Sequence, residues 1–229
     1  MAEISPDTDD IKITKLSPEH ASAVAELHIS HIRTGFISSL GVEFVTALYE
    51  AIAESPYGYG FVAVRDGEVV GFAAFAIHLS GLYKSVISKR GFRFLFSLSR
   101  KMMSFENIWK ALETLFYPAR VRNLPAAEFL SMVISKEERR KGLAAELIKR
   151  GFAETARRGV EELKGLVGAD NKLCNTLLLK CGFELVGQIN NHRVLSNIYL
   201  TRTDRFRRPS IFKKYSFQTS NAEMINTAM

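Results

Sequence analysis

The sequence predicts a mixed α/β (α+β) domain of alternating strands and helices, with a helical insertion in the middle of the chain. Two apolar runs, at 60–65 and 69–77, flank an Asp-Gly pair, which is a strong signal for a tight hairpin. Further along, an apolar strand at 128–134 leads through a basic turn into a helix at 142–158. With 229 residues, of which 47% are hydrophobic, the chain can bury a core of its own.

Local patterns predict the remaining elements in order. Apolar and polar residues alternate over 11–16, which indicates a strand. Ser17 and Pro18 then favour a helix start, because Ser caps a helix and Pro fits its first turn, and we expect this helix to end near Gly35. The other predicted elements are a helix at 41–54, a strand at 163–167, a helix at 171–180 that ends at Gly182, and a closing hairpin of strands 183–189 and 194–200.

The chain is expected to divide into a tail at 1–10, a folded domain at 11–201 and a second tail at 202–229. The domain contains the insertion at 82–125, in which aromatic and basic residues alternate. This insertion carries nine Lys and Arg against two Asp and Glu, within a net charge of +7. It is compatible with peripheral membrane contact, with a phosphate-bearing acceptor, or with a helical flap that packs on the sheet. Nucleic-acid binding is disfavoured, because no recognised motif accompanies the charge.

The sequence favours a cytoplasmic protein. It has no apolar run of roughly 18 residues that would span a bilayer, and its first ten residues are acidic and lack an apolar signal segment. Cys174 and Cys181 are the only cysteines, and we interpret them as reduced thiols of the core. No metal site is expected, because no cluster of ligand residues accompanies them.

The turn at 135–142 carries the clearest chemical signal. A buried strand runs into it and a helix begins directly after it, so several backbone N–H groups and the positive end of the helix dipole meet at one point. Gly142 and Ala144 are small enough for a bulky anion to approach the backbone. Arg139, Arg140 and Lys141 add positive charge. The stretch therefore predicts a pyrophosphate cradle, with an ordinary solvated helix start as the alternative.

The turn contains the motif Arg139-x-x-Gly142-x-Ala144, and thirty residues on Asn171-x-x-Cys174 is followed by Lys180-Cys181-Gly182-Phe183. In this order and spacing, the two motifs resemble those of the GNAT superfamily of acyl-CoA-dependent N-acetyltransferases. The resemblance covers most of residues 10–201 apart from the insertion. It implies a central twisted, mostly antiparallel sheet flanked by helices, and acetyl-CoA or another acyl-CoA as the cofactor.

The resemblance also implies which residues hold that cofactor. The pantetheine arm would pair with the backbone of the strand before the turn, and the pyrophosphate would be bound by N–H groups of the turn. The residues with these implied roles are Met132, Val133 and Ile134 for the arm, Arg139, Arg140, Lys141, Gly142, Leu143 and Ala144 for the pyrophosphate, and Asn171 for a further contact. Met132 to Ile134 would be β core in any fold, and Asn171 could instead cap its helix.

Catalytic residues are harder to assign. Members of the superfamily often carry a tyrosine as general acid in the second motif, but here Leu178 occupies that position. A water or Tyr199 could substitute for it. Glu128, at the start of the strand before the turn, is the candidate general base, with a strand-end glutamate as the alternative. His28, His31 and His78 are candidates for acceptor binding.

The predicted function is transfer of an acetyl or related acyl group from acyl-CoA to an amine of a small-molecule or saccharide acceptor. One alternative keeps the fold and replaces the acceptor by a protein lysine or N-terminus. The other is a catalytically silent acyl-CoA-binding sensor, which the leucine at position 178 suggests.

Overall fold

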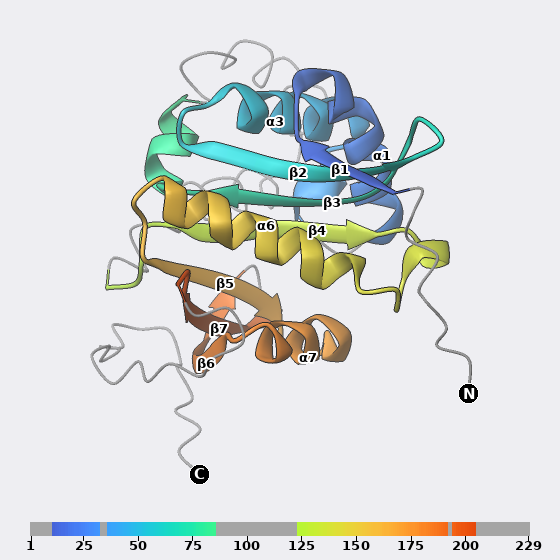
Figure 1. Cartoon of the computed structure of the whole chain (residues 1–229). Coiled ribbons are helices and arrows are strands. Elements are labelled where there is room, and N and C mark those ends of the chain that lie inside the picture. Colours follow the sequence, from blue (N-terminus) through green and yellow to red (C-terminus); the bar gives the residue numbers. More distant parts are fainter. Residues whose placement is uncertain (1–10, 33–35, 86–122, 192–193, 205–229) are drawn as a thin grey trace, which may run out of the picture.

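The protein is built on one seven-stranded sheet. The computed structural model describes residues 11–32, 36–85, 123–191 and 194–204. The strand order is β1-β2-β3-β4-β5-β7-β6, and every neighbouring pair is antiparallel except β4 and β5 (Figure 1). The strands are β1 (Lys12–Lys15), β2 (Gly58–Arg65), β3 (Glu68–Ala76), β4 (Glu128–Ile134), β5 (Glu162–Gly168), β6 (Glu184–Asn191) and β7 (Val194–Arg202). The mixed, mostly antiparallel architecture predicted from the sequence is confirmed.

Helices cover both faces of the sheet, and each face has its own apolar core. On one face α1 and α3 pack over the sheet, and on the other α6 and α7 do so. The helices are α1 (Ala21–His31), α2 (Phe36–Ser39), α3 (Val42–Glu54), α6 (Leu143–Arg157) and α7 (Lys172–Lys180), with the 3-10 turns η1 (Pro18–His20) and η2 (Lys136–Glu138). The two faces are called below the α1/α3 face and the α6/α7 face.

The predicted elements lie within two residues of the observed ones, with differences near the N-terminus. The turn after Ser17 is the 3-10 turn η1, which Ser17 and His20 cap reciprocally, and the α-helix begins only at Ala21. That helix ends at His31, before Gly35, which lies outside the described residues. The short helix α2 was not predicted. The tail at 1–10, most of the insertion at 82–125 and the tail beyond 204 also lie outside the described residues.

The hairpin of β2 and β3 closes as its Asp-Gly pair predicts. Asp66 has φ +52° and Gly67 has φ +83°, so both central residues adopt the left-handed conformation that a two-residue hairpin turn requires. β2 and β4 are both antiparallel to β3, so β2 and β4 finish at the same end of the sheet. The turn after β2 therefore lies near the C-terminal end of β4.

The sheet opens between β4 and β5. These strands pair only at Glu128 with Lys164 and at Phe129 with Gly165, although β4 continues to Ile134 and β5 to Gly168. β4 also has a bulge against β3, since the register shifts beside Phe129 and leaves Leu130 as the extra residue. Beyond Phe129, β4 therefore has an edge that is not paired with β5.

Candidate functional site

The helix α6 begins at the end of the sheet where β4 stops, so the turn between them lies beside the opening (Figure 1). Gly142 caps α6 with φ +83°, in the left-handed region that favours glycine. A Cβ atom built on Gly142 would meet no heavy atom within 4 Å. Arg140 is also left-handed, with φ +65°. The turn thus presents open backbone, as the cradle prediction requires.

The N–H groups of this turn point to a ligand that accepts hydrogen bonds. The first turn of any α-helix has N–H groups without intrahelical acceptors. In the part of the chain that the structure describes, no protein acceptor is assigned to the backbone N–H groups from Arg140 to Ala144. Because the helix dipole adds partial positive charge there, an anion would be stabilised at this point.

A buried carboxylate holds the turn against the hairpin. Glu138 is only 3% exposed and accepts hydrogen bonds from Arg65 at the end of β2 and from Lys141, the latter over 3.2 Å. The Arg139 Nε donates to the carbonyl oxygen of Ile134 over 3.1 Å, which ties the turn to the end of β4. Glu138 therefore orders two of the cations that surround the cradle.

Arg65 was not among the predicted site residues. It is 73 residues from Glu138 in the sequence, and no local pattern joins the two. The antiparallel order of β2, β3 and β4 is the one signal that could have placed it, because this order brings the β2–β3 turn to the end of β4.

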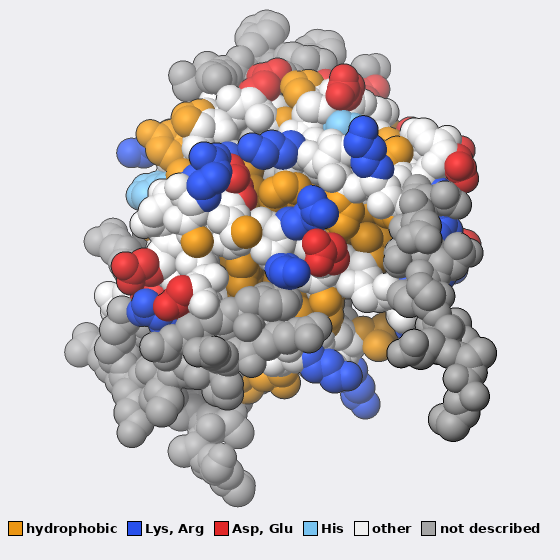
Figure 2. All heavy atoms as spheres, in the orientation of Figure 1, with side chains coloured by type: hydrophobic (Ala, Val, Ile, Leu, Met, Phe, Trp, Pro, Cys, Tyr) orange, Lys and Arg blue, Asp and Glu red, His pale blue; other side chains and the backbone are white. Residues whose placement is uncertain are grey.

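Positive charge is not confined to the cradle. Figure 2 shows Lys and Arg side chains spread over the face on which α6 lies, with acidic side chains among them. Several of these cations are paired along the helix, for example Arg150 with Glu146 over 3.1 Å. Charge on this face therefore offers general attraction for an anion, whereas the open backbone at Gly142 gives it a defined place.

The unpaired edge of β4 could accommodate an extended ligand such as the pantetheine arm of coenzyme A. Ile134 is buried in the core of the α6/α7 face and Val133 in that of the α1/α3 face, and the half-buried Met132 packs against the former. The backbone of these three residues is therefore what β4 offers to a ligand at the unpaired edge. The residues present thus fit coenzyme A: its pyrophosphate would lie at 139–144 and its pantetheine arm would follow β4. Ala144 is half-buried, next to the buried Leu143.

Asn171 caps its own helix. Its Oδ1 accepts a hydrogen bond from the backbone N–H of Cys174 over 3.1 Å, as the alternative interpretation of this residue expected. The side chain is exposed, and its NH₂ group has no assigned acceptor among the described residues. A cofactor contact by Asn171 stays a prediction.

Neither of the two positions considered for the general acid, 178 and 199, presents an exposed proton donor on the α6/α7 face. Leu178 is fully buried in the core of this face. Tyr199 is 2% exposed, and its hydroxyl donates to the Asn175 side chain over 2.7 Å, while Asn197 donates to the same amide oxygen over 2.9 Å. Tyr199 is thus bound in a network that attaches α7 to β7, and it would have to leave Asn175 to serve as an acid.

Glu128 is the first residue of β4 and is one of the two residues of this strand that pair with β5 before the strands separate. Its carboxylate is 3.3 Å from the ammonium group of Lys164, which is itself 2% exposed and donates to the Pro125 carbonyl over 2.6 Å. Burial raises the pKa of Tyr83, and the nearby Glu128 charge raises it further. Glu128 is therefore one half of a buried ion pair, and its role as a base stays a prediction.

The three predicted acceptor-binding histidines have different environments. His28 is buried, and burial lowers its pKa to about 4. His31 is half-buried, with its Nδ1 beside the Leu27 carbonyl and the Ser30 hydroxyl. His78 is exposed and accepts from the backbone N–H of Gly81 over 2.9 Å, so it caps the helical turn that follows. No assigned contact in the described residues joins these three side chains.

His28 instead starts a chain of polar groups that sequence reasoning missed. Its Nδ1 is 2.6 Å from the Tyr49 hydroxyl of α3, which is 2.9 Å from the Ser131 hydroxyl of β4. Tyr49 is 1% exposed, and it lies among apolar residues at helical spacing, a pattern that indicates a core position and no function. The available signal was the hydroxyl itself, since a buried tyrosine needs a hydrogen-bond partner.

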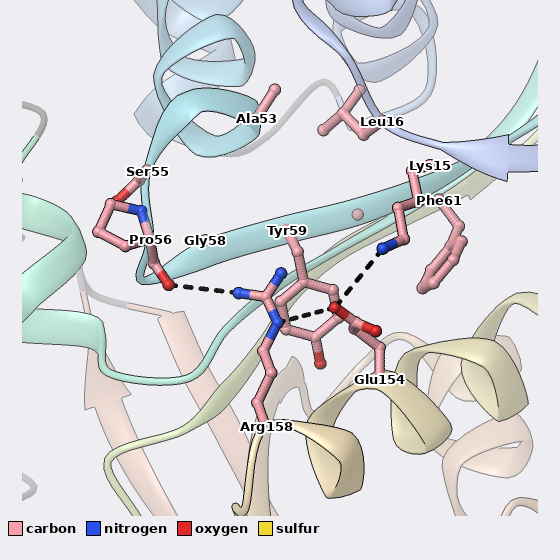
Figure 3. A pocket seen from close by; sticks show the side chains of 11 residues that line it. Lys15, Leu16, Ala53, Ser55, Pro56, Gly58, Tyr59, Phe61, Glu154 and Arg158 are labelled. Carbon is pink, nitrogen blue, oxygen red and sulfur yellow. Dashed lines mark hydrogen bonds and ion pairs between the residues drawn. The ribbon is translucent and has the colours of Figure 1, made fainter.

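A separate hollow of about 150 Å³ lies near the C-terminal end of α6 (Figure 3). There Arg158 lies over the ring of Tyr59 at 4.6 Å from its centroid, and Glu154 pairs with Arg158 and Lys15. Glu154 is twelve residues beyond Gly142, or about 18 Å along the helix. This charge cluster therefore belongs to the packing of α6 on β2 and not to the cradle.

Neither Cys174 nor Cys181 forms a disulfide among the described residues, and burial raises the pKa of Cys174 to about 11. Within the described ranges, no three His, Cys, Asp or Glu side chains gather in a group that could hold a metal ion. The helices of the same ranges include none with the length and apolar character needed to cross a bilayer.

The sequence matches the acetyltransferase (GNAT) family over residues 29–183, which include the opening, the cradle and the second motif. The chain belongs to this family. A search of curated proteins gives no match.

Solved structures of N-acetyltransferases share the fold. An N-acetyltransferase from Staphylococcus aureus Mu50 has 17% identity and a TM-score of 0.57, over 85% of this chain and 99% of that one. The PaiA N-acetyltransferase from Thermoplasma acidophilum, in complex with coenzyme A, has 15% identity and a TM-score of 0.54, over 84% and 98%. The ribosomal-protein-S18-alanine N-acetyltransferase from Escherichia coli has 14% identity and a TM-score of 0.53, over 90% and 99%.

Proposed function

We propose that this GNAT acetyltransferase transfers an acetyl or related acyl group from acyl-CoA to an amine of a small-molecule or saccharide acceptor. The observation that carries the proposal is the open turn at Gly142, with unbonded N–H groups and flanking cations, directly after a strand whose edge is separated from β5. The coenzyme A complex of the Thermoplasma acidophilum relative supports the choice of cofactor. The two cysteines form no disulfide among the described residues, which favours a reducing compartment such as the cytoplasm.

The chain's own residues would bind and orient the reactants. The N–H groups from Arg140 to Ala144 hold the pyrophosphate, with Arg139 and Lys141 beside it. The unpaired edge of β4 would align the pantetheine arm and direct the thioester toward Phe129, where β4 and β5 begin to separate. Bound acyl-CoA supplies an activated acyl group. Proximity of the amine to the thioester is then the main source of rate acceleration.

Calorimetric titration with acetyl-CoA tests the cradle, and the informative variant is Gly142→Glu. Its side chain would enter the space that the anion needs, add negative charge, and strain the backbone at φ +83°. We expect a loss of affinity for acetyl-CoA of at least about 100-fold, because a like charge next to a phosphate costs several kcal/mol at close range. Gly142→Asn separates charge from strain, since asparagine tolerates the left-handed region. Wild-type affinity in a folded Gly142→Glu variant would contradict the cradle assignment.

An acceptor screen then addresses the substrate. Amino sugars and their nucleotide conjugates would be tested first, followed by peptides with a free lysine or N-terminus, with release of the coenzyme A thiol as the readout. Turnover with peptides alone would replace the small-molecule proposal by the protein acceptor.

A silent acyl-CoA sensor is the second candidate, and the buried Leu178 favours it. A protein that binds acetyl-CoA but consumes it with no amine of the panel would support this candidate over the enzyme.

A further inference from the structure

The chain from His28 through Tyr49 to Ser131 crosses the core of the α1/α3 face and ends on the strand beside the opening. Its two hydrogen bonds, of 2.6 and 2.9 Å, join α1, α3 and β4. The ring of His28 also stacks on Phe72 of β3, with centroids 6.4 Å apart, and Tyr49 meets the same Phe72 ring edge-on at 5.2 Å. The aromatic packing thus fixes both rings, and the Tyr49 hydroxyl in turn holds the hydroxyl of Ser131 in place.

Ser131 occupies a special place on β4. It follows the bulged Leu130 and is two residues beyond Phe129, the last residue that pairs with β5. The bulge turns Ser131 toward the α1/α3 face, where it meets Tyr49 of α3. Ser131 is half-buried, in contrast to the fully buried Tyr49, so part of its surface stays accessible.

An arm that enters at the cradle and follows β4 toward Phe129 ends near Ser131. We propose that the Ser131 hydroxyl donates a hydrogen bond to the acyl carbonyl oxygen of bound acyl-CoA, and that Tyr49 and His28 are positioning residues which orient and polarise it. This inference rests on the proposed function, because it places the acyl group in the same opening.

The chemistry of the chain allows this direction of donation. Burial lowers the pKa of His28 to about 4, so its ring is neutral near pH 7 and carries one N–H. Burial also raises the pKa of Tyr49, which therefore stays protonated. When Nδ1 of His28 carries the hydrogen, His28 donates to Tyr49, Tyr49 donates to Ser131, and the Ser131 hydrogen is left for the carbonyl oxygen. Aligned donors polarise one another and stabilise the negative charge that develops on that oxygen.

Paired titrations test the contact. Free coenzyme A lacks the acyl carbonyl, so the ratio of its dissociation constant to that of acetyl-CoA isolates the acyl group. We expect Ser131→Ala to lower this ratio about three- to tenfold, as for the loss of one hydrogen bond, while affinity for free coenzyme A is unchanged. Tyr49→Phe should lower the ratio less, and Ser131→Thr, which keeps the hydroxyl, should preserve it.

The matched control is Tyr59→Phe. Tyr59 is another buried tyrosine, and its hydroxyl bonds to Thr155 and to the carbonyl of Gly151 on the α6/α7 face. This variant should leave the ratio unchanged. Nitrogen NMR of ¹⁵N-histidine protein adds a direct readout, with the Nδ1–H form of His28 expected when acetyl-CoA is bound.

The outcomes separate the two proposals. If acetyl-CoA and coenzyme A both bind and the ratio is the same in Ser131→Ala as in the wild type, the Ser131 contact is wrong while the proposed function stands. The Ser131 contact is also wrong, and the proposed function again stands, if the Nε2–H form of His28 persists in the acetyl-CoA complex. If neither ligand binds the wild type, the proposed function fails first, and the Ser131 contact fails with it.

Discussion

Gly151 of α6 lies against the Phe75 ring of β3, and this contact predicts the effect of a single methyl group. A Cβ atom on Gly151 would lie 2.0, 2.4 and 2.6 Å from three ring atoms of Phe75, whereas ordinary contacts begin at 3.4 Å. The Phe75 ring cannot swing away easily, because it is fully buried, stacked on Tyr59 at 5.2 Å and packed on Phe129 at 5.1 Å. Gly151→Ala must therefore displace α6 or the ring.

Two opposing effects set the magnitude. Alanine is the better helix former by roughly 1 kcal/mol, which would stabilise α6. Overpacking a dense core costs about 1–3 kcal/mol and occasionally more, and a contact 1.4 Å too short lies at the upper end of that range. We therefore expect Gly151→Ala to lower the free energy of unfolding by about 2 kcal/mol. For a domain of this size, that corresponds to a fall in Tm of roughly 4–8 °C.

Urea denaturation of a double-mutant cycle with Phe75→Leu identifies the cause. If the clash is responsible, Gly151→Ala costs less in the Phe75→Leu background, with a coupling of about 0.5–3 kcal/mol. Affinity for acetyl-CoA should fall as well, because a displaced α6 carries Gly142 with it. A Gly151→Ala protein at least as stable as the wild type would refute the reasoning, since it would show that α6 lies farther from β3.

Two further predictions concern buried charges. Glu128→Gln or Lys164→Met should each lower the free energy of unfolding by about 3–5 kcal/mol, because either change leaves a buried charge unpaired. The double variant should recover much of that loss. If urea denaturation shows that the two losses simply add, Glu128 and Lys164 do not stabilise the fold as an ion pair. The hydrogen bond from Arg157 lowers the pKa of Glu154 to about 2 in the folded state. Burial opposes this shift, whereas the positive charges of Arg158 and Lys15 add to it. The ordinary pKa of this carboxyl is 4.5, so the unfolded chain binds the proton first as the pH falls. The stabilisation by Glu154 is therefore complete above about pH 4.5 and is lost toward pH 2. Glu154→Gln should flatten the acid side of the stability curve, and an unchanged slope would count against this ion pair.

The elements that were predicted correctly are those with local signals. The Asp-Gly turn between β2 and β3 needs two left-handed residues, and both are present in adjacent positions. The turn before α6 is likewise marked by Gly142 and its basic neighbours. Such features depend on a few consecutive residues, so the sequence alone reveals them.

The contacts that were missed join residues far apart in the chain. Tyr49 and Ser131 are 82 residues apart, and Arg65 and Glu138 are 73 apart. The pairing depends on the strand order and on the bulge at Leu130, which decides the face that Ser131 occupies. A helical pattern marks Tyr49 as inward-facing but does not say what its hydroxyl meets. The same limit applies to Glu128, whose buried partner Lys164 comes from the parallel strand β5.

The two faces of the sheet differ in what they can contribute to proton and charge transfer at the opening. On the α6/α7 face, Leu178 fills the core and the Tyr199 hydroxyl is bound to Asn175, so this side holds the strands and helix together. On the α1/α3 face, a hydrogen-bonded chain reaches the half-buried Ser131. A hydroxyl donor at a carbonyl oxygen stabilises attack on the thioester, but it does not protonate the departing thiolate. Among the described residues, that proton would therefore come from solvent, from the acceptor itself, or from Tyr199 once it has left Asn175.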